Sequence, residues 1–407
     1  MSSAVAQAPH ALLTHLQGGA EAFVALRRDI HQHPELGYQE VRTSDLVAER
    51  LTAWGYQVTR GLGGTGLVGQ LRRGGGQKRL GLRADMDALP IQEATGLPWA
   101  SQHAGRMHAC GHDGHTAMLL AAAHHIAEHG RFSGTLNLIF QPAEEGLGGA
   151  KAMMDDGLFE RFPCDAIFAM HNMPGYPQGK LLLREGPLMA SSDGLTITLT
   201  GKGSHAAVPQ HGIDPVVAGS SIVLGLQSIV ARNVDPQAMA VITVGAFQAG
   251  HAHNVIPGEA VLKLSVRALD RKVRATLLRR IEELVDAQAR AFGVGWRMER
   301  VTGYPVLVNT RAETEFARRV ATELVGAARV EPQTVALSGS EDFAFMLEQV
   351  PGSYLLIGNG DGSDDGANGG HGACMVHNPG YDFNDANLPV GAAYWALLVE
   401  RFLSDAV

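Results

Sequence analysis

The sequence predicts an α/β protein in which a larger domain with a mostly parallel sheet is interrupted by a smaller, ferredoxin-like α+β domain. Up to about residue 190, short apolar segments alternate with helical patterns, which is typical of a parallel sheet covered on both faces. A β-α-β-β-α-β pattern then follows over about 110 residues. The first pattern resumes after it, and 407 residues are more than one domain usually holds. We therefore expect a discontinuous domain over residues 1–189 and 303–407, with residues 190–302 inserted.

The first part is expected to contain helices at residues 20–33 and 43–55. Pro34 ends the first helix, while Thr43 and Ser44 begin the second. The strands and further helices expected after them are strands 65–71, 79–85, 134–140 and 166–172, and helices 113–129 and about 148–156. Polar residues follow several of these strands, and in parallel sheets binding sites gather at the carboxyl ends of strands.

The inserted part begins with a strand at 195–203 and a helix at 214–232, for which Asp214 is the expected N-cap and Pro215 the first residue. Strands 240–250 and 260–269, helix 271–293 and strand 296–305 complete it. The last part contains helix 311–325, strand 353–359 and helix 389–403. Between the last two lies a glycine-rich loop of low complexity, expected to be mobile, whose His371 is given no role.

The composition excludes several classes of protein. With 45% hydrophobic and 18% charged residues, the chain is expected to be soluble and globular. A net charge of −8 without a basic run argues against nucleic-acid or anionic-membrane partners. Three cysteines do not form a disulfide framework, and the N-terminus lacks a secretory signal, so we expect a cytoplasmic protein. Histidines interrupt the most apolar helix well short of the ~20 residues that span a bilayer.

A metal site is indicated by "MHACGHDGHTAM", residues 107–118, which has three histidines, a cysteine and an aspartate in twelve positions. The candidate metal-binding groups are Cys110, His112, Glu144, Glu145, His171 and His377. A thiolate, imidazoles and a carboxylate suit zinc, manganese, cobalt or nickel better than magnesium or calcium. The N-terminus of the helix that begins here is expected to help hold Cys110 as a thiolate. Taken alone, Cys110 is better explained as a buried structural cysteine beside a capping histidine.

The segment "QPAEEG" places two adjacent glutamates just after an apolar strand. In a solvated loop such a pair has no special role. In a metal site, one carboxylate can bind the ion while the other takes the proton from a metal-activated water and delivers it to a leaving amine. A serine-hydrolase site is disfavoured because no G-x-S-x-G segment occurs, and "GLGGTG" precedes a strand, which makes it a weak dinucleotide motif.

Nine segments together resemble the N-acyl-amino-acid amidohydrolases, a family that includes hippurate hydrolases and auxin-conjugate hydrolases. That family lies within a larger group of dinuclear metallo-aminoacylases and carboxypeptidases. The segments span nearly the whole chain in order: "HPELGYQE", "GLRADMDALPIQE", "HACGHDGHTAML", "FQPAEEGLGGAKAM", "MHN", "GKGSHAAVPQHGIDPV", "NVIPGEA", "GSEDFAFM" and "HNPGYDFND".

The resemblance implies two divalent metal ions per subunit, bound by Cys110, His112, Glu145, His171 and His377, with Cys110 as the bridging ligand. It assigns the general base to Glu144. Asp85 stands where the wider group often has a metal-binding histidine, so it is left out of the ligand set. Asp87 matches a carboxylate that orients a ligand. The remaining histidines of the 113–129 helix are expected to be packing or surface residues: His115, His124, His125 and His129.

The implied reaction is hydrolysis of an N-acyl amino acid to a carboxylic acid and a free amino acid by metal-bound hydroxide. Arg267 and Asn254 are candidates to bind the substrate carboxylate, since arginine binds both its oxygens. A surface ion pair explains Arg267 almost as well. The resemblance also gives the inserted domain the roles of lid and dimerisation domain. His205 is then expected to reach the partner's site in a homodimer, or in a homotetramer, although a turn histidine is the simpler explanation.

Two other functions remain open. One is a dipeptidase, carboxypeptidase or N-acetyl-diaminopimelate deacetylase on the same scaffold. The other is a metal- or peptide-binding protein without activity, which the presence of Glu144 beside a full ligand set disfavours. Hydrolysis of N-benzoylglycine, compared with N-acetyl-diaminopimelate and dipeptides, separates these possibilities.

Overall fold

A computed structural model describes residues 10–362 and 374–404. The chain divides into two compact units, which are described separately. Unit 1 comprises residues 1–186, 308–335 and 345–407, and unit 2 comprises residues 187–307 and 336–344. The boundaries expected at 189/190 and 302/303 remain a prediction. His371 and most of the glycine-rich loop lie outside the described residues.

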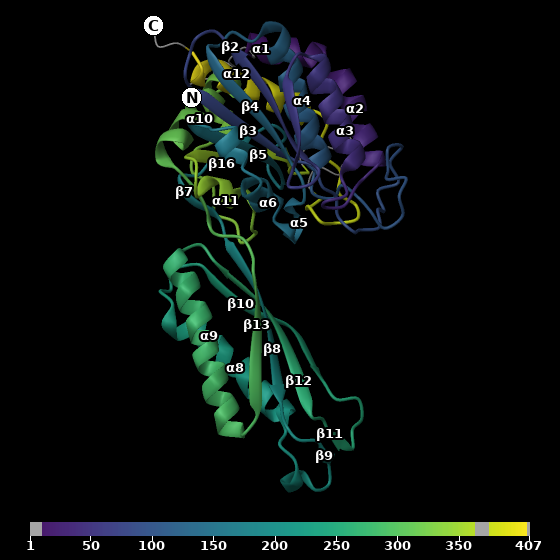
Figure 1. Cartoon of the computed structure of the whole chain (residues 1–407), viewed down its shortest axis with the longest axis vertical. Helices are drawn as coiled ribbons and strands as arrows, with labels where there is room; N and C mark the ends of the chain where they lie inside the picture. Colours follow the sequence, from purple (N-terminus) through teal and green to yellow (C-terminus); the bar gives the residue numbers. More distant parts are fainter. Residues whose placement is uncertain (1–9, 363–373, 405–407) are drawn as a thin grey trace, which may run out of the picture. The chain divides into compact units, whose positions relative to one another are not determined.

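Unit 1 is built on an eight-stranded mixed sheet in the order β1-β2-β4-β3-β5-β16-β6-β15 (Figure 1). The four central strands β4, β3, β5 and β16 are parallel, as the alternation of strands and helices predicted. Antiparallel pairings join β2 to β4, β1 to β2 and β6 to β16. The strands are β1 Gln57–Leu62, β2 Gly66–Arg73, β3 Arg79–Asp85, β4 Gly134–Gln141, β5 Ala166–Pro174, β6 Leu181–Leu182, β15 Val330–Glu331 and β16 Gly352–Gly360. An α/β fold is therefore confirmed, with antiparallel strands at both edges.

The helices of unit 1 cover this sheet. They are α1 Ala11–Gly18, α2 Ala20–Gln32, α3 Val41–Ala53, α4 His112–His129, α5 Glu144–Leu147, α6 Gly149–Asp155, α7 Leu158–Arg161, α10 Arg311–Val325 and α12 Asn387–Phe402. Helix α4 is buried on almost every side, since Ala117–Ala123 all belong to the hydrophobic core. Such a helix packs closely against its neighbours, and α4 lies beside α2 and α12. Its first turn is therefore held rigidly.

The start of α3 differs from the prediction. The helix begins at Val41, two residues before Thr43, because a more distant carboxylate satisfies its first backbone amides. Glu35 accepts hydrogen bonds from the backbone N–H groups of Arg42 and Thr43, at 2.9 and 2.8 Å. An acceptor supplied from outside the helix replaces the local cap.

Unit 2 has the predicted β-α-β-β-α-β order, with an antiparallel sheet in the order β10-β12-β8-β13. Its elements are β8 Ser191–Thr200, α8 Pro215–Asn233, β10 Ala240–Ala249, β12 Glu259–Ala268, α9 Arg271–Phe292 and β13 Gly295–Thr302. Asp214 is confirmed as the N-cap of α8, since it accepts from the N–H groups of Val216 and Val217. A separate two-stranded ribbon pairs β9 Ser204–His205 with β11 Val255–Ile256 (Figure 1).

Helix α8 is the one helix of the described residues that is long and apolar enough, by length and composition, to cross a membrane. Its inner side belongs to the core of unit 2, where Ile222, Leu226 and Ile229 are fully buried. The remaining short elements are β7 Gly186–Met189, η1 Pro209–His211, β14 Leu307–Asn309, η2 Ala327–Arg329 and α11 Phe343–Leu347.

Candidate metal centre

The five side chains expected to bind metal meet in unit 1. Cys110 lies two residues before α4, His112 is the first residue of that helix, Glu145 lies on α5, His171 on β5 and His377 in the loop before α12. The ligand atoms of Cys110, His112 and His171 lie within 4.8 Å of one another, and so do those of Cys110, Glu145 and His377. Cys110 therefore belongs to both groups of three, the position that a bridging ligand between two ions requires.

Individual distances show how tightly the donor atoms cluster. Cys110 Sγ lies 3.3 Å from His171 Nε2, and Glu145 Oε1 lies 3.1 Å from His377 Nε2 and 4.0 Å from His112 Nε2. The backbone of His377 is held near Cys110, because its N–H donates to the carbonyl of Ala109 at 2.7 Å. Its φ of +65° is in the left-handed region, which a non-glycine residue seldom adopts.

Gly111 allows Cys110 and His112 to lie on either side of a tight turn. Its φ is +89°, and a Cβ at this position would lie 2.3 Å from Asn172 Nδ2 and 2.5 Å from Tyr381 Oη. Only glycine fits such a position. Asn172 in turn donates to the carbonyl of Cys110 at 2.6 Å and accepts from Tyr381 at 2.7 Å. Sequence reasoning gave Asn172 and Tyr381 no role, although both lie in its quoted motifs.

Hydrogen bonds assign the free nitrogen of two histidines. His171 Nδ1 donates to the backbone carbonyl of Asn172 at 2.6 Å, and His112 Nδ1 contacts Asp87 Oδ1 at 3.2 Å. Because carbonyl and carboxylate oxygens only accept here, each Nδ1 carries a hydrogen, which leaves Nε2 as the ring nitrogen that can bind a metal ion. Such partners fix the tautomer of metal-binding histidines in proteins.

Asp87 contacts two of the expected ligands at once. Besides its contact with His112, its Oδ2 accepts a hydrogen bond from the backbone N–H of Glu145 at 2.9 Å. Asp87 is 1% exposed, so neither contact competes with bulk water. This geometry suits the orienting role expected for Asp87.

The site has the donors and the charge to hold divalent ions. His112 Nε2 and Glu145 Oε1 are buried and lack a hydrogen-bond partner among the described residues. Burial would lower the pKa of His112, but Asp85, Asp87 and Glu145 outweigh it and raise this pKa to about 10. A bound cation would take the place of that proton. A thiol, imidazoles and a carboxylate suit the later transition metals and zinc.

The charge of Cys110 depends on more than the helix that begins beside it. The start of α4 does not hold a thiolate in the polypeptide alone, because burial together with Glu145 and Glu144 raises the pKa of the Cys110 thiol well above its usual range. The helix dipole is worth less than this desolvation and like-charge repulsion. Deprotonation of Cys110 therefore depends on a bound cation.

The turn after β4 places the two glutamates in different positions. Ala143 has a φ of +53° and Gly146 a φ of +79°, so the chain changes direction on both sides of the pair. Glu144 is only 7% exposed, and a carboxylate oxygen of each glutamate lies within 4.8 Å of a ring nitrogen of His112. Glu144 thus has the proximity to the centre that a proton-transferring group needs.

His115 is not the packing residue that was expected. It is buried, its Nδ1 lies 2.6 Å from Asp85 Oδ1, and its Nε2 accepts from the backbone N–H of Asn172 at 3.0 Å. Both ring nitrogens are therefore used within the protein, and His115 is poorly placed to bind metal. Asp85 also pairs with Arg83 at 2.5 Å, which suits its exclusion from the ligand set. Residues i and i+3 share one face of a helix, so the spacing of His112 and His115 could have indicated that His115 lies close to the candidate centre.

A buried ion-pair network anchors the start of α4. Asp113 lies 3.0 Å from Arg27 Nε and 2.8 Å from His31 Nδ1, and all three side chains are fully buried. Although burial opposes it, Arg27 and His31 hold the pKa of Asp113 far below its usual range. The network ties α2 to the turn of α4 that carries His112, and so limits movement of that ligand.

The remaining predicted residues belong to unit 2. His205 and Asn254 lie together at the β9–β11 ribbon, where His205 pairs with Val255 and the Asn254 carbonyl accepts from Ala206 at 3.0 Å. Arg267 lies near the C-terminal end of β12, and its side chain donates a hydrogen bond to the Ser338 carbonyl at 3.0 Å. Since β12 starts at Glu259 and a strand rises ~3.3 Å per residue, Arg267 is roughly 26 Å further along. The start of β12, which follows the β9–β11 ribbon in the sequence, is therefore far from Arg267.

His205 has the local contact of a turn histidine. Its Nδ1 accepts a hydrogen bond from the backbone N–H of Ala207 at 3.1 Å, and the residue is exposed. With Nδ1 as acceptor, the neutral ring carries its hydrogen on Nε2. The turn contact thus leaves His205 with a donor that points away from its own backbone.

Comparison with known proteins identifies relatives over almost the whole chain. Residues 81–401 match the model of peptidase family M20/M25/M40. The hippurate hydrolase of Campylobacter jejuni is 45% identical over 94% of this chain and 96% of its own length. The IAA-amino acid hydrolase ILR1-like 2 of Arabidopsis thaliana is 40% identical, over 94% of this chain and 85% of its length.

A solved structure supports the same relationship. The YxeP protein of Bacillus subtilis, a dinuclear metal-binding peptidase of family M20, matches 95% of this chain and 99% of its own. The TM-score is 0.80 and the sequence identity 31%.

Proposed function

The chain belongs to peptidase family M20/M25/M40 and is a metal-dependent amidohydrolase, and we propose that it cleaves N-acyl amino acids of the hippurate type. The products are a carboxylic acid and a free amino acid. One observation carries the proposal: Cys110 belongs to two neighbouring groups of three donors, with Glu144 beside them. The relatives that act on hippurate and on IAA-amino acids support the substrate class.

Two divalent ions, of zinc, manganese, cobalt or nickel, are proposed for this centre. Cys110, His112 and His171 would hold one, while Cys110, Glu145 and His377 would hold the other. Bound ions of this kind polarise a carbonyl group and lower the pKa of water. Asp87 keeps His112 and Glu145 in the orientation that this binding requires.

Glu144 is proposed as the base. Its carboxylate takes a proton from the attacking water as the new C–O bond forms at the acyl carbon. The same carboxylate then protonates the nitrogen as the C–N bond breaks, which releases a neutral amine and restores Glu144. Burial of Glu144 keeps bulk water from competing for that proton.

The substrate carboxylate and the acyl oxygen need further donors, and we propose that two subunits supply them. Arg267 lies near the C-terminal end of β12, whereas Asn254 lies at the β9–β11 ribbon that precedes this strand, so Asn254 and His205 would act on the site of a partner. His205 Nε2–H would donate to the oxygen that gains negative charge. A C₂ homodimer formed through unit 2 provides this exchange, and a homotetramer could be built from such dimers.

The surface of unit 2 is compatible with such an interface. Most of the exposed large hydrophobic side chains of the described residues belong to it: Val208, Ile213, Val217, Leu224, Phe247, Val255, Phe292 and Val301. Apolar surface of this kind favours association.

A cytoplasmic location is also proposed, because all three cysteines are free thiols.

The substrate class is tested with a panel of compounds. N-benzoylglycine, N-acetyl-diaminopimelate, simple dipeptides and IAA-amino acid conjugates are assayed with Zn²⁺, Mn²⁺, Co²⁺ or Ni²⁺ supplied. We expect the highest kcat/KM for N-acyl amino acids. A preference for dipeptides or for N-acetyl-diaminopimelate would replace the proposed substrate, and failure on every amide with metal bound would leave a binding protein.

The shared site is tested by mixing two inactive variants. His205→Ala should keep its metal and its dimer but lose ~10²–10³-fold in turnover, which is typical of one lost oxyanion donor. Exchange of its subunits with Glu144→Gln should restore activity, because one site of each mixed dimer keeps both residues. No recovery despite proven subunit exchange would place His205 in its own chain's site or outside the reaction.

A further inference from the structure

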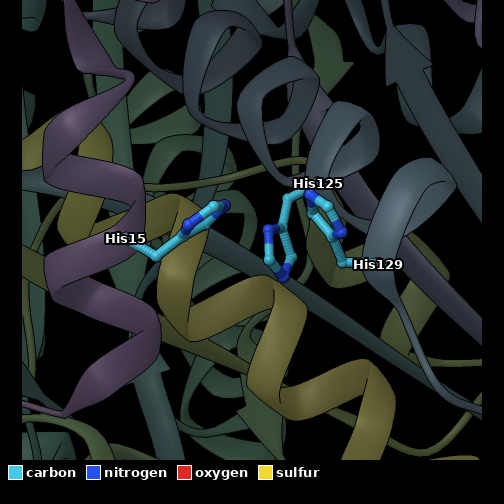
Figure 2. A group of neighbouring side chains, drawn as sticks. All are labelled: His15, His125 and His129. Carbon is cyan, nitrogen blue, oxygen red and sulfur yellow. The ribbon is translucent and has the colours of Figure 1, made fainter.

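A second group of histidines lies at the other end of α4. His15 on α1 extends toward His125 and His129 on α4, as Figure 2 shows. One nitrogen from each ring lies within 4.8 Å of the other two. The ring centroids are 5.2 Å apart for His15 and His125, 5.4 Å for His15 and His129, and 5.2 Å for His125 and His129. The three residues form what we call the α1–α4 histidine cluster.

The cluster is separate from the centre that contains Cys110. His125 lies 13 residues after His112 on one continuous helix, and at ~1.5 Å per residue this places it roughly 20 Å away along the axis. None of the residues assigned to the candidate centre belongs to the cluster. An ion held here would therefore be additional to the proposed pair.

His125 is suited to bind a cation rather than a proton. Its Nδ1 is buried and has no hydrogen-bond partner among the described residues. Burial, followed by the nearby rings of His15 and His129, lowers the pKa of His125 to about 4. The ring is therefore neutral at pH 7, and a neutral imidazole has one nitrogen with a lone pair that can bind metal.

The surroundings leave space for an ion and a further ligand. The three histidines line a pocket of about 710 Å³. Its other lining residues are mainly apolar, with Glu128, Arg50 and His124 as the remaining charged or polar side chains. If the three histidine rings only packed against one another, one nitrogen of each ring would not need to lie near the other two beside this pocket. Glu128 contacts His129 Nε2 at 3.6 Å and His124 Nε2 at 3.4 Å. It thus lies beside the cluster and adds negative charge near a bound cation.

We propose that His15, His125 and His129 bind one zinc-class dication, such as Zn²⁺, Co²⁺, Ni²⁺ or Cu²⁺, and that this ion fastens α1 to α4. Three imidazoles and an open fourth position for water are a common arrangement for these metals. The fastening has a physical purpose, because α1 has only eight residues and a helix of that length is marginal without tertiary support.

The metal content of the holoenzyme tests the binding site. Wild type, His15→Ala, His125→Ala and the control His124→Ala are incubated with excess Zn²⁺, dialysed and measured by elemental analysis. His15 is exposed, so its replacement should leave the fold intact. His124 belongs to the same helix but packs on Trp54 outside the cluster. We expect one ion more per chain in wild type and His124→Ala than in the two cluster variants.

Equal ion content in wild type and His15→Ala would overturn the site. Hydrolysis of N-benzoylglycine should be the same in His15→Ala and wild type, so failure of this proposal is distinguishable from failure of the proposed function. A second readout uses protein whose dinuclear centre already holds Zn²⁺, to which Co²⁺ is then added. Wild type should gain the visible absorption of four-coordinate cobalt, and His15→Ala should not.

The fastening role is tested by stability. Excess Zn²⁺ should raise the melting temperature of the wild-type holoenzyme by about 2–4 °C and slow proteolysis within α1, because a ligand that binds only the folded state stabilises it. His15→Ala should show neither change. An additional ion that binds without altering melting or proteolysis would refute the fastening of α1.

Discussion

The two ends of α4 both carry histidines, but their surroundings differ. At the N-terminal end, carboxylates raise the pKa of His112 to about 10 against the effect of burial. At the C-terminal end, burial and neighbouring rings lower the pKa of His125 to about 4. Asp87 orients His112, whereas no hydrogen-bond partner among the described residues orients His125 Nδ1.

This difference supports separate roles for the two ends, a proposed catalytic metal centre and a proposed binding site. The N-terminal end combines a shared thiol, orienting partners and a buried carboxylate that can transfer protons. The C-terminal end offers imidazoles and an exposed glutamate, Glu128. Charge and orientation, rather than the number of histidines, therefore support the proposal that the first end has the hydrolytic role.

The largest effect is expected from removing the base at the N-terminal end. Glu144→Gln should keep its bound metal and lose ~10²–10⁴-fold in kcat, the usual contribution of a general acid–base group. Glu128→Gln, which removes the glutamate at the other end, should retain wild-type kcat. Steady-state kinetics and elemental analysis of both variants measure this. Comparable losses of kcat in the two would remove the distinction between the ends.

The next effect concerns the shared ligand. Cys110→Ala should lower both metal content and activity, and the affinity for metal should fall by more than the ~10–100-fold that loss of an outer partner costs. Cys164→Ala is the matched control, since Cys164 is a free thiol far along the chain. Glu145→Gln should also weaken metal binding, in contrast to Glu144→Gln. A full metal complement in Cys110→Ala would end its assignment as a bridge.

A smaller loss is expected where orientation alone is changed. Asp87→Asn keeps one acceptor oxygen but cannot satisfy both His112 Nδ1–H and the Glu145 N–H, so metal affinity should fall ~10–100-fold. Competition with a chromophoric chelator measures it. Asp155→Asn, at an exposed position paired with Lys151, should bind metal as wild type does. Unchanged affinity in Asp87→Asn would show that the two ligands need no orienting group.

The smallest effect concerns acid stability at the C-terminal end. The folded pKa of His125, about 4, lies below its ordinary value of 6.5, so the unfolded chain binds more protons between these values. The stability that the neutral form of His125 contributes to the folded state is complete above pH 6.5 and is lost as the pH falls toward 4. Because His125 is half-buried, solvent screening limits the effect to about 1 kcal/mol.

Between pH 7 and 5, the free energy of unfolding should therefore fall by about 1 kcal/mol less in His125→Gln than in wild type. Urea unfolding of the metal-free proteins measures this difference. His124→Gln serves as the control and should follow the wild type. A parallel loss of stability in wild type and His125→Gln would show that the neutral form of His125 is not favoured by the fold.

Several features could be predicted from the sequence because they depend on local order. The elements of unit 2 follow from clear periodicity and from the Asp214 cap. The family and its amidohydrolase activity follow from motifs that recur in sequence order, and the comparisons confirm both. The edge strand β1 was missed, because it is short and largely exposed and therefore lacks an apolar run.

The same local reasoning could not sort the histidines of α4. His115, His125 and His129 were expected to have equivalent roles, but His115 contacts Asp85 and Asn172, while the other two face His15. Their partners lie on β3, β5 and α1, at separations in sequence that no periodic pattern encodes. The carboxylates that raise the pKa of Cys110 also come from other segments, so no local pattern indicates them.

By itself, the sequence determined which chemical groups this protein has, where its strands and helices form and which family it resembles, because these depend on residue type and on neighbours within a few positions. Only the tertiary structure decided which groups share a charge environment and which nitrogens remain free to bind. Those properties depend on burial and on distances of a few ångströms between residues far apart in the chain, such as His15 and His125, or Asp87 and Glu145. Such distances arise only when the core packs around α4.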